Sequence, residues 1–418
     1  MKDKDIIENL NKLNLYAEIY DARDGVGDSY GYIVNFCKNF TETNKGYRYC
    51  IKEDHKKLYR DTLLSIFRKG QIECNYTLNT IKQKMNDFLL EYKIKDSDIS
   101  ERDFNRFFNK INNAKKNKLD IFHKIYGMDI FADDPVIIGC FTLYNYNLHK
   151  EAIYKIPGYK SEGAFLEGCE EFANHNFWIS IEVEVIDSKK AYEIACERFD
   201  IFQGLCQLFI DLQGYNVYAI SIMNDVASTR DECYLFSKGE YHCFGENNIR
   251  RRRNLNVQVV VSKRHQFVKR IAERVFAEEN NQINNRIIRA MAIYGRAVHE
   301  YSKEQKLVLY IECIEALIGY DEKNLADMLS DYFSGIVSEN YEEFKTYKRS
   351  FKTIYDVRSR ISHGEKTNVP DAFLTIVREY AICMMENFLD DKEIAGFTKD
   401  KDLREHLKSK VVRLEKTT

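Results

Sequence analysis

The chain has 418 residues, of which 44% are hydrophobic, and its 65 acidic and 63 basic side chains leave a formal net charge of -2. This length favours two or three domains, each large enough to bury a hydrophobic core. The near-balance of charge excludes a globally basic nucleic-acid-binding surface, although a local basic groove is compatible with it.

Eleven cysteines are scattered through the sequence, and none belongs to a C-x-x-C pair or to a Cys/His cluster with zinc spacing. This pattern is typical of reduced thiols, so we expect no metal and no other cofactor. The N-terminal segment is charged where a signal peptide is apolar, and no window approaches the roughly 18 apolar residues of a membrane span. We therefore expect a cytoplasmic protein without a membrane partner.

The N-terminal part of the chain mixes helix-like and strand-like segments. Apolar residues at helical spacing predict three helices, over residues 78–92, 103–126 and 188–212. Residues with β-branched and aromatic side chains predict four strands, within residues 135–147, 177–186, 215–223 and 255–261. In the second of these strands, Ile181 to Ile186 alternates apolar and acidic residues, as a half-exposed strand does. The sequence thus predicts an α+β region over residues 1–265, with room for two subdomains.

After about Ser262 the strand-like pattern ends, and helical periodicity continues almost to residue 390. Five helices with short connections are expected, over residues 283–299, 302–319, 323–337, from 342 through the segment 355–365, and 368–389. The second is apolar nearly all round, which places it at the centre of a bundle. We therefore expect an all-α bundle over residues 275–392 and a charged tail or peripheral helix over 393–418, so that the fold class is α+β multidomain.

The segment "YDVRSRISHGE", Tyr355 to Glu365, carries the strongest candidate site. On a helix, the buried stripe would consist of Ile354, Val357 and Ile361. The opposite face would carry Arg358, Ser359, Ser362 and His363. Arg358 and His363 would then lie about 140° apart around the helix axis, with the serines between them. Two interpretations follow: a solvated helix face that ends in a histidine, or a groove that holds a phosphodiester.

The second interpretation has a specific chemical logic. RNA carries its own nucleophile, the 2′-hydroxyl, so its cleavage needs no metal. It needs a group that accepts and donates protons near neutral pH, which suits histidine. It also needs a permanent cation that holds the phosphate, and arginine fills that role better than lysine.

The segment R-S-R-I-S-H-G, Arg358 to Gly364, resembles the R-x4-H signature of the HEPN superfamily. Upstream, "INNRIIRAMAIYGRAV" and "LVLYIECIEALIG" resemble the first two helices of its Apea-like branch. The likeness covers roughly residues 280 to 390 with consistent order and spacing. It implies a helical bundle that forms a homodimer, in which two Arg/His pairs face each other across a two-fold axis. It also implies a hydrolase, a metal-independent endoribonuclease of toxin or antiviral defence systems.

By this resemblance Arg358 would bind the phosphate and His363 would act as general base or acid. From the helix geometry, the hydroxyls of Ser359 and Ser362 would support the site between them. Glu315 matches the family's helix-two glutamate and would orient the site, although a salt bridge from Glu315 to a nearby arginine is an equally good reading. We expect an RNA substrate, such as tRNA, with the N-terminal region sensing a trigger or positioning that substrate.

A basic run, "IRRRRN", precedes the bundle and could contact phosphates, although a solvated connector fits it as well. The candidate RNA-binding residues are Arg250, Arg251, Arg252, Arg253 and Arg360. The rival function is a catalytically silent HEPN-like module that binds nucleic acid or a partner protein. In a nuclease, Arg358 and His363 of two subunits should converge in an open basic cleft. In a silent module they should be salt-bridged, far apart or occluded.

Overall fold

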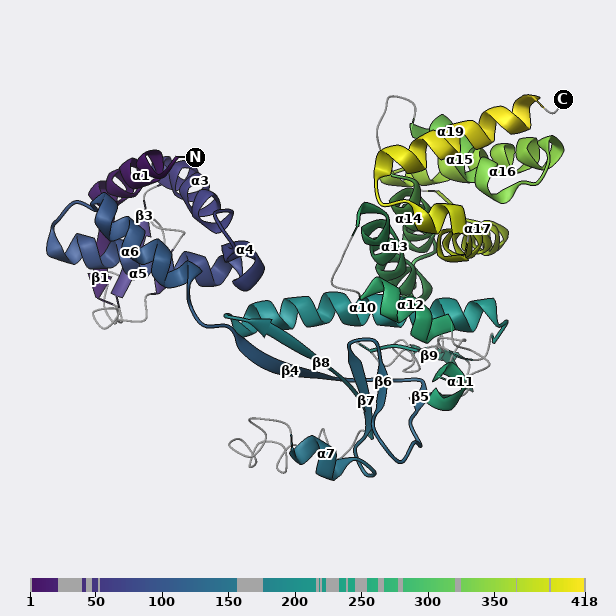
Figure 1. Ribbon diagram of the computed structural model, residues 1–418, viewed down its shortest axis with the longest axis horizontal. Helices are drawn as coiled ribbons and strands as arrows, with labels where there is room; N and C mark the ends of the chain where they lie inside the picture. Colours follow the sequence, from purple (N-terminus) through teal and green to yellow (C-terminus); the bar gives the residue numbers. More distant parts are fainter. Residues whose placement is uncertain are drawn as a thin grey trace. The chain divides into compact units, whose positions relative to one another are not determined.

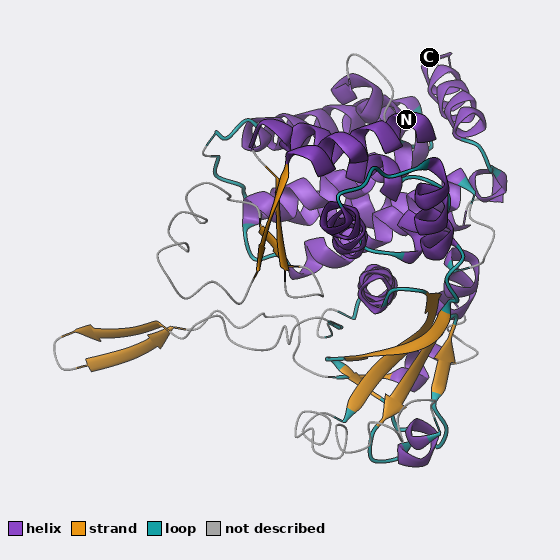
Figure 2. Ribbon diagram, turned by 90° about the vertical axis from the view of Figure 1, so that its left-hand side faces the viewer, coloured by secondary structure: helices purple, strands orange, loops and turns teal. Residues whose placement is uncertain are grey.

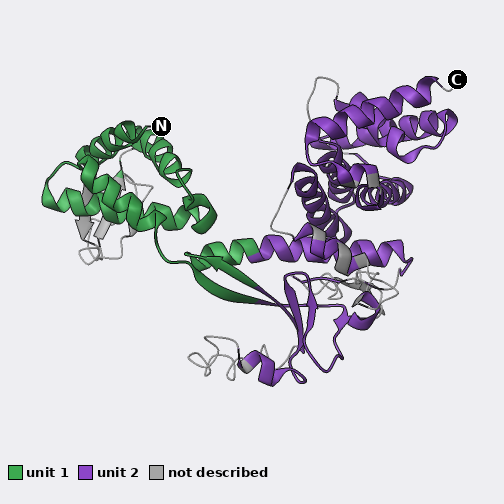
Figure 3. Ribbon diagram, in the orientation of Figure 1, with its two compact units in different colours: residues 1–121, 182–194 green, residues 122–181, 195–418 purple. Residues whose placement is uncertain are grey.

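The computed structural model describes residues 2–21, 40–42, 47–51, 53–155, 176–215, 218, 220–222, 233–237, 240–244, 254–261, 267–276, 281–319, 325–365, 367–390 and 392–416. The chain divides into two compact units (Figure 3). Unit 1 comprises residues 1–121 and 182–194, and unit 2 comprises residues 122–181 and 195–418. The division expected between residues 265 and 275 falls inside unit 2 and stays a prediction.

The predicted fold class is confirmed: a mixed α/β N-terminal region with antiparallel sheet is followed by a mostly helical C-terminal region (Figure 1). Among the described residues, the last strand ends at Asn256. In the described part of the chain, no helix has the length and apolar character needed to cross a bilayer.

Unit 1 packs helices around a small sheet. Its helices are α1 (Asp3–Tyr16), η2 (Glu53–His55), α3 (Lys56–Phe67), α4 (Ile72–Asn75), α5 (Leu78–Lys95) and α6 (Glu101–Asn112). Its sheet is antiparallel, with the order β1 (Ala17–Asp21), β3 (Tyr47–Ile51) and β2 (Phe40–Glu42). Fully buried apolar side chains from several helices form one core, among them Ile6, Leu10, Ile66, Ile81, Leu89 and Phe104. The predicted helix over residues 78–92 is confirmed as α5.

The helix predicted over residues 103–126 is only half correct. It begins at a capping box, in which Ser100 accepts a hydrogen bond from the backbone of Asp103, but it ends at Asn112. Asn113 follows as the C-cap, and short polar side chains of this kind compete with the helical backbone for hydrogen bonds. Residues beyond this point form the strand β4 (Asn117–Lys124) instead.

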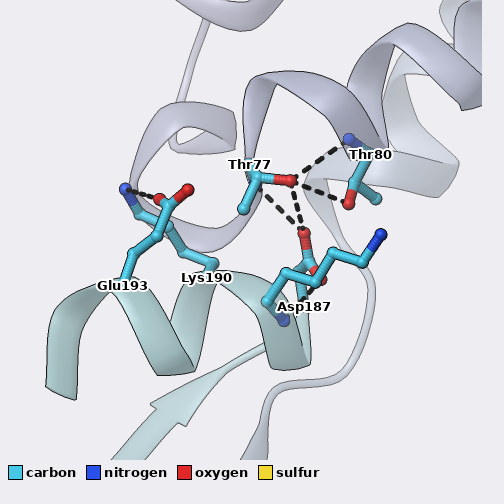
Figure 4. A network of polar contacts seen from close by, with 6 residues as sticks. Thr77, Thr80, Asp187, Lys190 and Glu193 are labelled. Atoms are coloured by element: carbon cyan, nitrogen blue, oxygen red, sulfur yellow. Dashed lines mark hydrogen bonds and ion pairs between the residues drawn. The ribbon is translucent and has the colours of Figure 1, made fainter. Parts of the chain in front are cut away.

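Asp187 joins the start of α5 to the start of the helix that follows it in the sequence (Figure 4). Its Oδ2 accepts hydrogen bonds from the backbone N–H of Thr77, at 3.0 Å, and from the Thr77 hydroxyl, at 3.2 Å. Its Oδ1 accepts the backbone N–H of Lys189 at 3.0 Å, in the first turn of α10 (Ser188–Leu212). Burial acts to raise the pKa of Asp187, but these hydrogen bonds and one from Thr80 outweigh it and lower the pKa.

A four-stranded sheet has the order β4, β8 (Phe177–Val185), β7 (Phe141–Asn145) and β6 (Val136–Ile138). The strand predicted within residues 135–147 is a hairpin of β6 and β7, and it turns at Gly139, whose φ of +59° favours glycine. The strand predicted at 177–186 is confirmed, and so is its alternation, with Ile181, Val183 and Val185 buried and Glu182 and Glu184 exposed.

The shorter elements of unit 2 are β5 (Met128–Asp129), α7 (Lys150–Tyr154), β9 (Cys233–Ser237), β10 (Glu240–Phe244), β11 (Leu255–Asn256), α11 (Val257–Val261), α12 (Phe267–Val275) and α18 (Lys392–Gly396). The strand predicted over 255–261 is therefore wrong beyond Asn256. The side chain of Asn256 accepts the backbone N–H of Gln258 at 2.9 Å, which favours a helical start and overrides the strand preference of the valines. Of the strand predicted over 215–223, the described residues show only a bridge between Ser221 and Tyr126.

Helix α10 confirms the predicted helix over 188–212 and lies along the four-stranded sheet (Figures 1 and 2). The ring of Phe202 packs on Phe141 of β7, with ring centroids 4.7 Å apart. On its other side, Gly204 contacts α13 (Gln282–His299) so closely that a Cβ there would lie 2.0 Å from the carbonyl oxygen of Met291. Helix α10 thus lies between the sheet and the helical bundle within unit 2.

A buried carboxylate fixes α10 to the bundle. The Asp211 side chain is 1% exposed and forms an ion pair of 2.5 Å with Arg378 of α17 (Asp371–Asp390). It also accepts hydrogen bonds from Tyr294 of α13 and, at 3.2 Å, from Gln207. Burial, followed by the charge of Asp211, raises the pKa of Tyr294 well above its ordinary value. These donors compensate the desolvation of the carboxylate.

All five predicted bundle helices are confirmed, as α13, α14 (Lys303–Ile318), α15 (Leu325–Val337), α16 (Tyr341–Ser362) and α17. At the start of α14 Ser302 accepts the backbone N–H of Gln305, and Gly319, with φ +83°, ends the helix. Helix α14 is the central helix and packs against α13, α15, α16 and α17. The C-terminal segment forms α19 (Asp400–Lys416), which buries Leu403 and Leu407 and packs on α15.

Candidate functional site

Helix α16 carries the segment that the sequence singles out. It starts at Asn340, whose side chain accepts the backbone N–H of Glu343 at 3.0 Å, and it ends at Ser362. His363 is the C-cap residue, and its backbone N–H donates to the carbonyl oxygen of Ser359 at 3.1 Å. Gly364 follows with φ +81°, a conformation that favours glycine and terminates the helix.

Apart from Arg358, the two faces of this helix differ as the sequence predicts. Ile354 and Val357 are buried, and Ile361 at the end of the stripe is half-buried. On the polar face, Ser362 and His363 are exposed and Ser359 is half-buried. The imidazole of His363 is therefore accessible to a ligand from solvent.

Arg358 turns toward the central helix of the bundle. Its Nη2 donates to Oε2 of Glu315 on α14 at 3.1 Å. The Glu315 side chain is 0% exposed and that of Arg358 is 21% exposed, so the pair is largely removed from water. This contact fits both roles that the sequence leaves open for Glu315, an orienting carboxylate and a salt-bridge partner.

Tyr355 completes this cluster one helical turn before Arg358. The guanidinium of Arg358 lies over the Tyr355 ring, 5.5 Å from its centroid. The pKa of Tyr355 is raised to about 12, first by burial, then by the charge of Glu315 and a hydrogen bond with it, while Arg358 acts to lower it. The arginine is thus held between a carboxylate and an aromatic face.

Within one chain, Arg358 and His363 do not form a joint contact. In the part of the chain that is described, no hydrogen bond or ion pair connects the two side chains. Arg358 points to α14, whereas His363 stands exposed at the end of α16. A shared phosphate would have to bridge them, or a second copy would have to supply one of the two groups.

A hollow of about 390 Å³ borders the same glutamate on its other side. It lies among α13, the end of α14 and the start of α19, and Arg289, Arg404 and Glu315 line it. Arg286, another lining residue, is neutralised by Asp400, with Nε–Oδ1 and Nη2–Oδ2 distances of 2.8 Å. The hydrogen bond from Arg286 is the main cause that lowers the pKa of Asp400.

Arg289 is the exposed cation of this hollow. It forms no ion pair with any described residue, so its charge is available to an anion from solvent. Gly319 also lines the hollow, and a Cβ at this position would lie 1.8 Å from Nη1 of Arg286, so the guanidinium packs closely against the glycine.

Of the predicted RNA-binding residues, Arg250 to Arg253 lie outside the described residues. Arg360 is exposed in the last turn of α16, where a polyanion can reach it. The sequence-based reading did not identify Arg289 and Arg404. The three-residue spacing of Arg286 and Arg289 on one helix face was a usable signal, but their proximity to Arg404 arises only from the packing of α19.

The described residues contain no cluster of three or more His, Cys, Asp or Glu side chains that could hold a metal ion. No protein-family model, curated protein or solved structure matches this chain. The HEPN resemblance therefore rests on the R-x4-H segment and the two helices before it.

Proposed function

We propose that this chain is a metal-independent endoribonuclease in which Arg358 holds the scissile phosphate and His363 transfers the proton. The observation that supports the proposal is the arrangement at the end of α16. There an exposed histidine follows an arginine whose guanidinium is positioned by a fully buried carboxylate.

The reaction follows from the groups present. A neutral His363 accepts the proton of the ribose 2′-hydroxyl, and the oxygen attacks the adjacent phosphorus. The bond to the 5′-oxygen breaks, which leaves a 2′,3′-cyclic phosphate, and a protonated imidazole returns a proton to that oxygen. Arg358 offsets the charge that builds on the five-coordinate phosphorane. A guanidinium has five N–H donors and Glu315 takes one of them, so donors remain for the phosphate.

The proposal includes a second copy of the chain. In the HEPN resemblance, two Arg/His pairs face across a two-fold axis, so one histidine can act as base and the other as acid. Arg289, Arg404 and Arg360 would contact phosphates on either side of the cleavage point. A role in a toxin or antiviral defence system, with the N-terminal region as sensor, belongs to the same proposal.

The test is cleavage of labelled single-stranded RNA and tRNA in EDTA by the wild type, Arg358→Ala and His363→Ala. Arg349→Ala is the matched control, because Arg349 is an exposed arginine on the same helix. The proposal expects cleavage by the wild type and the control, with cyclic phosphate ends, and loss of cleavage in both site variants. Wild-type activity that disappears in EDTA would contradict it.

One observation favours a second candidate, a catalytically silent module that binds RNA or a protein. The ion pair of Arg358 with Glu315, without a contact from Arg358 to His363, is the arrangement expected for such a module. RNA binding without cleavage by the wild type, measured by a gel shift under the same conditions, would establish this alternative and exclude the nuclease.

A further inference from the structure

Unit 1 contains a pocket of about 600 Å³ that lies between α3 and α5 and is separate from the candidate site on α16. Ile51, Leu63 and Leu78 contribute apolar walls. Its volume lies in the range of small-molecule sites, which are mostly apolar with a few polar groups that fix orientation. The pocket can therefore hold a ligand of moderate size with a flat or apolar part.

Cationic side chains border this pocket. Lys56, Lys57 and Arg60 come from α3, and Lys82 comes from α5. The described lining residues include no aspartate or glutamate. Nε of Arg60 lies 3.6 Å from Oδ1 of its neighbour Asp61, but both side chains are exposed, so this ion pair is weak. Three of these cations, Lys57, Arg60 and Lys82, favour a ligand with more than one negative charge.

A buried amide in the pocket wall adds an independent sign of a ligand. Asn86 is 1% exposed and lines the pocket. Its Oδ1 accepts the hydroxyl of Tyr59 at 2.7 Å, whereas its Nδ2 has no partner among the described residues. Exchanging the two ends of the amide would leave the oxygen unpaired instead. A buried amide left unpaired is unfavourable, so a ligand that reaches and pairs with it gains affinity.

We propose that this pocket binds a nucleoside 5′-phosphate. Lys57, Lys82 and Arg60 would hold the phosphate, the apolar walls would contact the faces of the base, and the amide of Asn86 would pair with a polar atom on the base edge. An inorganic anion would use only the cations, and a neutral apolar ligand only the walls. The nucleotide is the ligand class that uses all three. This inference concerns unit 1 and does not depend on the proposed nuclease.

The test is isothermal titration calorimetry of the full chain with AMP, GMP, CMP and UMP, and with pyrophosphate as a probe that lacks a base. The variants are the double substitution Lys57→Ala/Lys82→Ala, which changes rim side chains, and Tyr59→Phe, which frees Asn86 from its hydroxyl partner. Lys110→Ala is the matched control, because Lys110 is an exposed helical lysine of unit 1 that does not line the pocket.

At least one nucleotide should bind with a Kd at least tenfold lower than that of pyrophosphate. The double variant should raise this Kd by roughly tenfold or more, since a hydrogen bond to a charged group contributes about 1.5–3 kcal/mol. Lys110→Ala should leave the Kd unchanged, and Tyr59→Phe should alter the preference among bases. Equal binding of pyrophosphate would overturn the assignment, as would no binding of any of the four nucleotides.

Discussion

Replacing Arg358 with alanine should destabilise the helical bundle because it leaves the Glu315 carboxylate buried without its cation. At an effective dielectric constant of about 20, two unit charges about 4 Å apart attract each other by about 4 kcal/mol. Tyr355 still offers Glu315 a hydrogen bond, and the arginine is one-fifth exposed, so part of this loss is recovered. We expect Arg358→Ala to lower the free energy of unfolding by about 2–3 kcal/mol, just below the usual range for a broken buried pair.

The assay is urea unfolding followed by far-UV circular dichroism. The midpoint should fall without a change in the m-value. Adding Glu315→Gln to Arg358→Ala removes the uncompensated charge and should restore about half of the loss, which a double-mutant cycle measures as coupling. Arg349→Ala, an exposed change on the same helix, should stay within about 0.5 kcal/mol of the wild type. If Arg358→Ala also stays within that limit and Glu315→Gln restores nothing, the buried pair does not position the arginine.

Two further predictions concern the attachment of α10. Gly204→Ala places a Cβ 2.0 Å from the Met291 carbonyl oxygen, so it should lower the free energy of unfolding by about 3 kcal/mol in a urea titration. Gly396→Ala is the control, because a Cβ there meets open space, and it should leave the free energy of unfolding unchanged. Asp187→Asn should lower the free energy of unfolding at neutral pH. Because the folded-state pKa of Asp187 is lowered, the difference in unfolding free energy between this variant and the wild type should shrink as the pH falls below 3.8. Glu193→Gln, an exposed change on α10, is the control. A loss of unfolding free energy in Asp187→Asn that is the same at pH 7 and pH 3, or no larger than that of the control, would contradict this assignment.

The bundle was predictable because its signals are local. The caps at Ser302 and Gly319, and the stripe of Ile354 and Val357, lie within single helices, so periodicity was sufficient to predict the elements. The direction of Arg358 was not predicted, because the sequence places it on the polar face, whereas its guanidinium turns to the buried Glu315 on another helix.

The elements and site residues that the sequence did not predict depend on contacts between distant segments. Residues 117–124 read as the end of a helix, but they become a strand through pairing with β8 in a sheet that the local pattern does not reveal. Val257 to Val261 favour a strand by composition, yet the side chain of Asn256 starts a helix. Arg289 and Arg404 lie more than one hundred residues apart in sequence, so only the packing of α19 brings them to one hollow.

The most direct test of the nuclease proposal uses a labelled single-stranded RNA and its fully 2′-O-methylated counterpart, each incubated with the wild type in EDTA. The proposed mechanism predicts that the unmodified RNA is cleaved to 2′,3′-cyclic phosphate ends, and that the methylated strand stays intact because its nucleophile is blocked. Cleavage of both strands would show that the 2′-hydroxyl is not the nucleophile and would contradict the roles assigned to Arg358 and His363.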